Sequence, residues 1–176
     1  MKRLKQLGII LVLVISLGLT ACQTQTRPPS DLVTVKTVLS GQSLDIFWRN
    51  QTVTLRLAGL DAPDRRQTPW SEQARVALTQ QLAAPEPLYL EPSAPERDRY
   101  DRQWGYLWQG DRLINLWLIE QGYALAKQNL RSPYRTQLRH AQDYARLMGT
   151  GIWQPDQPLR QTPQEFRAQP TEFTDE

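Results

Sequence analysis

The chain has 176 residues, 40% of them hydrophobic and 22% charged, with a formal net charge of +3 at pH 7. It contains a single cysteine and a single histidine, which excludes a disulfide within the chain. Three of the 21 basic residues and none of the 18 acidic ones lie among the first 21 residues, so the remainder carries no net charge. Global charge therefore gives no argument for binding of nucleic acid.

The N-terminal segment has the pattern of a targeting sequence. Positive residues precede an apolar run at 7–19, which is shorter than the ~20 residues of a membrane-spanning helix. The run ends in Leu19-Thr20-Ala21-Cys22, which resembles a bacterial lipobox, where lipid is attached to the cysteine. We predict a lipoprotein signal peptide over 1–21, then lipidated Cys22 and a tether over 22–31. The expected location is the cell envelope, lipid-anchored and extracytoplasmic, at the outer membrane or cell surface.

The rest of the chain predicts one domain over 32–155 and a disordered tail over 156–176. Alternating apolar residues and turn signals predict five strands, at 32–39, 44–48, 53–57, 88–91 and 103–108. Helical spacing and breakers predict three helices, at 68–82 with Thr68 as cap, at 112–121, and from 132 to a stop at Gly149. Strands with interspersed helices indicate an α+β fold, a five-stranded OB-type barrel.

Two segments pair arginines with carboxylates. The first is Arg56-Leu57-Ala58-Gly59-Leu60-Asp61-Ala62-Pro63-Asp64, and the second is Asp98-Arg99-Tyr100-Asp101-Arg102-Gln103-Trp104-Gly105-Tyr106. If they converge, arginines and aspartates could bind a phosphodiester, hold a hard cation and position a water. Those are the requirements of metal-assisted hydrolysis of nucleic acid.

Three further segments stand later in the chain: Leu113-Ile114-Asn115-Leu116, Glu120-Gln121-Gly122-Tyr123-Ala124 and Gly151-Ile152-Trp153. In order and spacing the chain resembles the staphylococcal nuclease-like (thermonuclease) family from about residue 33 to 153. The resemblance implies an OB-fold nuclease that hydrolyses phosphodiester bonds in DNA or RNA with calcium as cofactor. We expect it to be a monomer.

The resemblance also assigns roles in catalysis. Arg56 and Arg102 would contact the phosphate and stabilise the charge that develops on it. Asp64 would position or deprotonate the attacking water. It stands where the family has a glutamate, so its carboxylate lies one methylene closer to the backbone.

The implied calcium ligands are Asp61 and the backbone carbonyl of Ala62, helped by Gln42. Gln42 stands where the family has an aspartate, so it offers a neutral oxygen in place of a charged one. Calcium is held more tightly as more of its ligands are charged. The alternative interpretation is therefore a binding module that has lost its metal and keeps a surface for nucleic acid or an envelope partner.

The aromatic residues of the predicted strand at 103–108 leave two possibilities. Trp104, Tyr106 and Trp108 alternate along it, and aromatic side chains on an OB barrel can stack on bases. At this spacing aromatic side chains more often pack in a core, and we expect that role for all three.

Overall fold

The computed structural model describes residues 28–94, 96–127 and 131–169. The predicted signal peptide, Cys22 and most of the predicted tether lie outside these residues, and so does the end of the predicted tail. No helix in the described part is long and apolar enough to cross a membrane.

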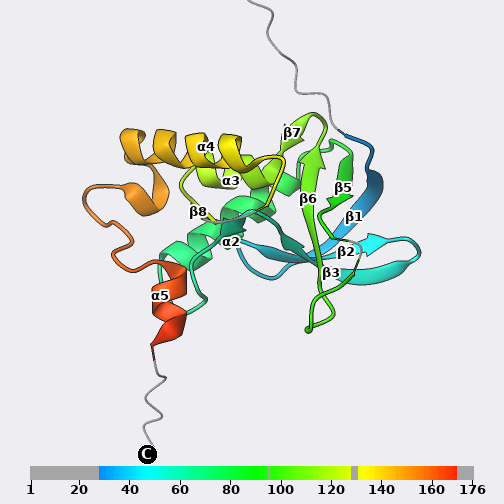
Figure 1. Cartoon of the computed structure of the whole chain (residues 1–176), viewed down its shortest axis with the longest axis horizontal. Helices are drawn as coiled ribbons and strands as arrows, with labels where there is room; N and C mark the ends of the chain where they lie inside the picture. The colour runs from blue at the N-terminus through cyan, green and yellow to red at the C-terminus, as the bar shows by residue number, and fades with distance from the viewer. Residues whose placement is uncertain (1–27, 95, 128–130, 170–176) are drawn as a thin grey trace, which may run out of the picture.

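Five strands form the barrel: β1 (Asp31–Val38), β2 (Ser43–Trp48), β3 (Gln51–Leu57), β5 (Leu88–Pro92) and β6 (Gln103–Gln109). β1 pairs with β2 and β5, β2 pairs with β3, and β5 pairs with β6, all antiparallel. The parallel pairing of β3 with β6 closes the barrel (Figure 1). The predicted α+β, OB-type fold is confirmed.

The remaining elements surround this barrel. They are β4 (Leu60–Asp61), α2 (Trp70–Leu82), β7 (Arg112–Leu113), α3 (Ile114–Glu120), β8 (Leu125–Ala126), α4 (Arg135–Met148), the 3-10 turn η1 (Gly151–Trp153) and α5 (Pro163–Ala168). The helix predicted at 68–82 begins two residues later, and the side chain of Thr68 does not cap it. The helix predicted at 112–121 starts only after the short strand β7, whereas Gly149 ends α4 in the left-handed conformation, as predicted.

The β2–β3 hairpin sets the direction of Arg56. Both turn residues, Arg49 and Asn50, have positive φ, which matches the right-handed twist of the strands. The resulting register places Arg56 opposite Ser43. Because side chains alternate along a strand, Leu55 and Leu57 point into the core and Arg56 points to the other face.

Asn115 fastens α3 to the barrel beside the end of β3. Its side chain is fully buried, and its amide donates to the carbonyls of Ala58 at 2.8 Å and Gly105 at 3.2 Å. Its Oδ1 accepts a hydrogen bond from the Leu107 N–H at 2.9 Å. These bonds satisfy backbone groups where β3 leaves the barrel, so they fix the segment that leads from Arg56 to Asp61.

The segment predicted as a disordered tail differs from that prediction as far as residue 169. It turns back along the domain and forms α5, which Figure 1 shows at the same end of the molecule as the start of α2. Thr162 Oγ1 accepts from the Glu165 N–H at 3.2 Å, and the Glu165 carboxylate accepts from the Thr162 N–H at 2.8 Å. This reciprocal cap, with Pro163 in the first turn, lets a short polar segment form a helix.

Candidate functional site

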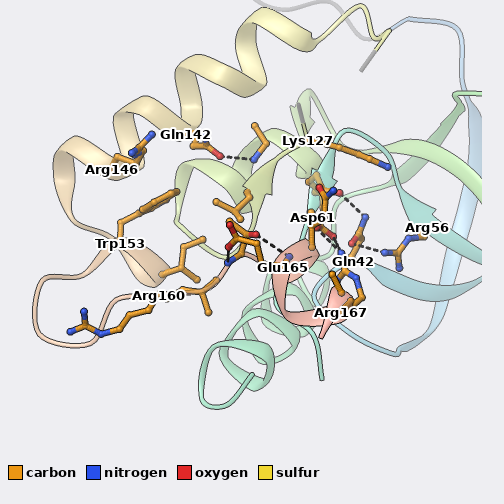
Figure 2. A pocket seen from close by; sticks show the side chains of 18 of the residues that line it. Gln42, Arg56, Asp61, Lys127, Gln142, Arg146, Trp153, Arg160, Glu165 and Arg167 are labelled. Carbon is orange, nitrogen blue, oxygen red and sulfur yellow. Dashed lines mark hydrogen bonds and ion pairs between the residues drawn. The ribbon is translucent and has the colours of Figure 1, made fainter. Parts of the chain in front are cut away.

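A cavity of about 1180 Å³ lies at the end of β3, between the barrel and the segment that carries α4, η1 and α5. Figure 2 shows side chains from both sides converging on it. Of the predicted catalytic and metal-site residues, Gln42, Arg56 and Asp61 line this cavity, whereas Ala62, Asp64 and Arg102 are not among its lining residues.

Gln42 is a buried residue of the cavity lining and is only 3% exposed. Its Nε2 donates to the carbonyls of Leu57 at 3.2 Å and Leu60 at 2.7 Å. Its Oε1 accepts from Arg56 Nη2 at 3.0 Å and from the Ala62 N–H at 3.3 Å. Gln42 therefore holds the β3–β4 turn in shape and orients Arg56.

Arg56 lines the cavity on the side of the barrel (Figure 2). Besides Gln42, its guanidinium bonds to Ser43 Oγ at 3.2 Å. Burial lowers the pKa of Arg56, the positive charge of Arg102 lowers it further, and Arg167 adds to this against the opposing effect of Asp61. Like charges are thus gathered around a partly desolvated guanidinium, and an anion in the cavity would relieve their repulsion.

The ring of Trp104 lies close to three cationic side chains. It lies 5.5 Å from the Arg56 guanidinium carbon, 6.0 Å from that of Arg102 and 5.2 Å from Lys127 Nζ. Tyr106 and Trp108 are buried as predicted, but Trp104 is half-buried and lines the cavity. The core prediction is therefore confirmed for two of these aromatic residues and needs correction for Trp104.

Arg102 is held by a carboxylate beside the cavity. Its Nε and Nη2 donate to Asp98 Oδ2 at 2.9 and 2.7 Å, and Trp104 Nε1 donates to the same oxygen at 2.9 Å. Partial burial would raise the pKa of Asp98, but the hydrogen bonds from Arg102 and Trp104 outweigh this and hold it well below its usual value. The Asp98 carboxylate thus positions Arg102 against Trp104.

Substituting Asp98 should reveal this bond as a pH-dependent loss of stability. A carboxyl whose folded-state pKa is depressed stabilises the protein above its unfolded pKa of about 3.9, and the contribution is lost as pH falls through the folded value. We expect Asp98→Asn to lower the melting temperature at pH 7, with the gap to wild type narrowing below about pH 4. Thermal unfolding across pH measures this, and a gap that stays constant would contradict it.

Asp61 pairs with a residue that the sequence did not single out. Arg167 Nη2, from α5, donates to both Asp61 carboxylate oxygens, at 2.8 and 2.7 Å (Figure 2). The Arg167 side chain is 38% exposed and the Asp61 side chain is 18% exposed, so the ion pair lies at the cavity wall. The cationic side chains around Asp61 and Trp104 are those of Arg56, Arg102, Lys127 and Arg167, and the carboxylates are those of Asp61 and Asp98. Arg146, Arg160 and Glu165 also line the cavity.

Asp64 does not line the cavity and is bonded to Arg66 and Gln67 instead. Its Oδ1 accepts from the Arg66 N–H at 3.2 Å and from Arg66 Nε at 3.0 Å, and its own N–H donates to Gln67 Oε1 at 2.9 Å. Burial would raise the pKa of Asp64, but the Arg66 hydrogen bonds outweigh it and lower that pKa. The role of Asp64 with the attacking water stays a prediction.

Comparison with known proteins gives this geometry a context. The family model described as staphylococcal nuclease homologue matches residues 54–155, more than half of the chain. The chain belongs to the staphylococcal nuclease family. The match contains Arg56, Asp61 and Arg102, and it ends before α5 begins.

Three relatives of this staphylococcal nuclease homologue illustrate the similarity. A thermonuclease of Staphylococcus intermedius is 30% identical over 136 residues, which cover 74% of this chain and 80% of that protein. A micrococcal nuclease of Shigella flexneri is 28% identical over 139 residues, covering 74% and 76%. An uncharacterized endonuclease of Haemophilus influenzae is 29% identical over 160 residues, covering 90% and 83%.

The calcium site that the family resemblance implies does not fit the residues present. The Gln42 amide oxygen already accepts two hydrogen bonds, and Arg167 occupies both oxygens of Asp61. Among the described residues, no group of three histidine, cysteine or acidic side chains could hold a metal ion. One carboxylate, already neutralised by a guanidinium, is a poor donor set for a cation that takes six to eight oxygen ligands. In this arrangement the predicted ligands Asp61 and Gln42 serve the protein's own hydrogen bonds, and Ala62 donates its N–H to Gln42.

Proposed function

We propose that this member of the staphylococcal nuclease family binds DNA or RNA phosphodiesters at the Arg56 cavity and hydrolyses them. The observation that carries the proposal is the partly desolvated Arg56 guanidinium beside Trp104, with further cations around it. No carboxylate among the described residues forms a hydrogen bond with it. Relatives described as thermonuclease and micrococcal nuclease support the reaction class.

The chemistry follows from where the charges lie. Hydrolysis transfers the phosphoryl centre from an ester oxygen to a water oxygen: the P–O ester bond breaks, a P–O bond to water forms, and a proton passes from the water to solvent or the leaving oxygen. Negative charge builds up on the non-bridging oxygens during this step. Guanidinium groups stabilise it best because they are planar, always charged and able to donate two parallel hydrogen bonds. Arg56, oriented by Gln42, is placed for that role, and Arg102 adds positive charge from beside Trp104.

A second candidate is a binding module that holds nucleic acid without cutting it. The observation that favours this alternative is the Asp61–Arg167 ion pair, together with the engaged amide of Gln42. In such a module the cationic cavity and Trp104 would still contact phosphates and a base.

Incubation of the purified full chain with single-stranded DNA and, separately, RNA distinguishes the two functions. The reaction is run once with calcium and once with chelator. Cleavage products in either of the two reactions are the expected result and would support the nuclease. Binding to intact polymer under both conditions would instead establish the binding module. Absence of both binding and cleavage by folded protein would overturn the proposed function.

The location of the protein is proposed on its sequence alone. A lipid on Cys22 would place the domain outside the cytoplasmic membrane, at the cell envelope. Replacing Cys22 with serine is expected to release the protein from the membrane fraction of cells that express it. Equal membrane association of the two forms would contradict lipidation at this position.

A further inference from the structure

Arg167 is placed where the family resemblance expects a metal ion. Its Nη2 reaches both Asp61 oxygens, and its Nε and Nη1 have no hydrogen-bond partner in the part of the chain that the structure describes. Figure 2 shows Arg167 and Arg56 approaching the Asp61–Gln42 region from different sides. Free donors at the cavity wall, next to a second guanidinium, are suited to an anion shared between them.

The segment that carries Arg167 is anchored to the domain at several points. Gln67 Nε2 donates to the Gln161 carbonyl at 2.9 Å, and Trp70 Nε1 donates to the Gln157 carbonyl at 3.2 Å. The Leu159 N–H donates to the Ile152 carbonyl at 2.8 Å. With the reciprocal cap at the start of α5, these bonds hold the helix against the cavity, so Arg167 is part of a built wall.

Two changes at this site act in the same direction. Gln42 supplies a neutral amide at a position that the resemblance assigns to an acid, and its oxygen is used to orient Arg56. Arg167 supplies a guanidinium at Asp61, the carboxylate that the resemblance assigns to the metal. One negative charge fewer and one positive charge more both weaken attraction for a divalent cation. Both also strengthen attraction for a phosphate.

We propose that Arg167 takes the place of the divalent cation and contacts the substrate phosphate together with Arg56. Nucleic acid then binds this cavity without any divalent cation. The inference rests on the proposed function, because it assumes that the Arg56 cavity is the phosphodiester site. It adds a substrate-contacting residue from α5, which lies beyond the matched residues 54–155.

Fluorescence anisotropy of a short, cleavage-resistant phosphorothioate single strand tests the inference on the full chain. Wild type is expected to bind equally well in calcium and in chelator. Arg167→Gln should bind about tenfold more weakly in chelator, the effect of one lost charge-assisted contact. The slope of log affinity against log salt should decrease in magnitude by about 0.7, as for one phosphate contact on a single strand. Arg167→Lys should keep the slope and recover part of the affinity.

Arg75→Gln is the matched control. Arg75 also forms an ion pair with a carboxylate, that of Glu72, and its side chain is 40% exposed against 38% for Arg167, but it lies on α2 and does not line the cavity. Its removal should leave affinity and salt slope within about twofold of wild type.

Several results would overturn the inference. Tighter binding by Arg167→Gln would show that α5 blocks the site, and a calcium requirement in wild type would show that the cation is still needed. If Arg56→Met abolishes binding while Arg167→Gln changes nothing, the proposed function stands and the role of Arg167 is wrong. No binding by wild type in either condition would overturn both.

Discussion

Arg56→Met is expected to lower hydrolysis of single-stranded nucleic acid at least about a hundredfold, the usual effect of removing one donor aimed at developing charge. Methionine keeps the apolar stem and loses only the guanidinium. Burial and the neighbouring cations depress the pKa of Arg56, which means that its positive charge is unfavourable in the folded protein. We therefore expect the free energy of unfolding to fall by no more than about 1 kcal/mol. Loss of activity with stability retained is typical of a residue kept for function.

The control for this variant is Arg75→Met, which removes a surface arginine of α2. It should retain activity within about twofold of wild type, because its ion pair with Glu72 lies away from the cavity and surface pairs contribute little. Steady-state cleavage rates and chemical denaturation of both variants provide the comparison. Near-normal cleavage by Arg56→Met would show that hydrolysis takes place away from Arg56.

Gln42→Met is expected to have the largest effect on stability. The side chains are similar in length, but methionine forms none of the four hydrogen bonds that Gln42 makes to Leu57, Leu60, Ala62 and Arg56. Each buried group left without a partner costs about 1–3 kcal/mol. We expect the free energy of unfolding to fall by about 3 kcal/mol or more.

Urea denaturation of Gln42→Met beside Gln73→Met tests this expectation. Gln73 lies on the exposed face of α2, so its replacement should change stability by no more than about 0.5 kcal/mol. A Gln42→Met protein as stable as wild type would mean that the β3–β4 turn does not depend on this amide. It would also remove the physical argument that Gln42 orients Arg56.

Much of the fold follows from local sequence. Alternation of apolar residues in β3 predicts that Leu55 and Leu57 are buried and that Arg56 points away from them, as the structure has it. Such patterns are decisive because one face of each strand must leave water. The convergence of Gln42, Arg56 and Asp61 depends on the β2–β3 pairing and the turn after β3, and the family resemblance supplied that expectation.

The places of Arg167 and Trp104 in the site were not predicted, because they depend on contacts between residues far apart in the chain. The Thr162–Glu165 spacing is a helix-start signal, and it could have identified α5 inside the predicted tail. Nothing in the local pattern, however, pairs Arg167 with a carboxylate 106 positions away. Trp104 was expected in the core because it alternates with Tyr106 and Trp108. It lies instead where β6 meets β3 beside Arg56, a position that depends on closure of the barrel.

A crystal structure of the full chain with a phosphorothioate dinucleotide, grown in the presence of chelator, would show where the phosphate binds. We expect a phosphate group within hydrogen-bond distance of both the Arg56 and Arg167 guanidinium groups, with Trp104 beside it. A dinucleotide bound with its phosphate remote from Arg56 would show that the Arg56 cavity is not the phosphodiester site. A phosphate at Arg56 alone, with Arg167 still turned wholly to Asp61, would keep the site and remove Arg167 from it.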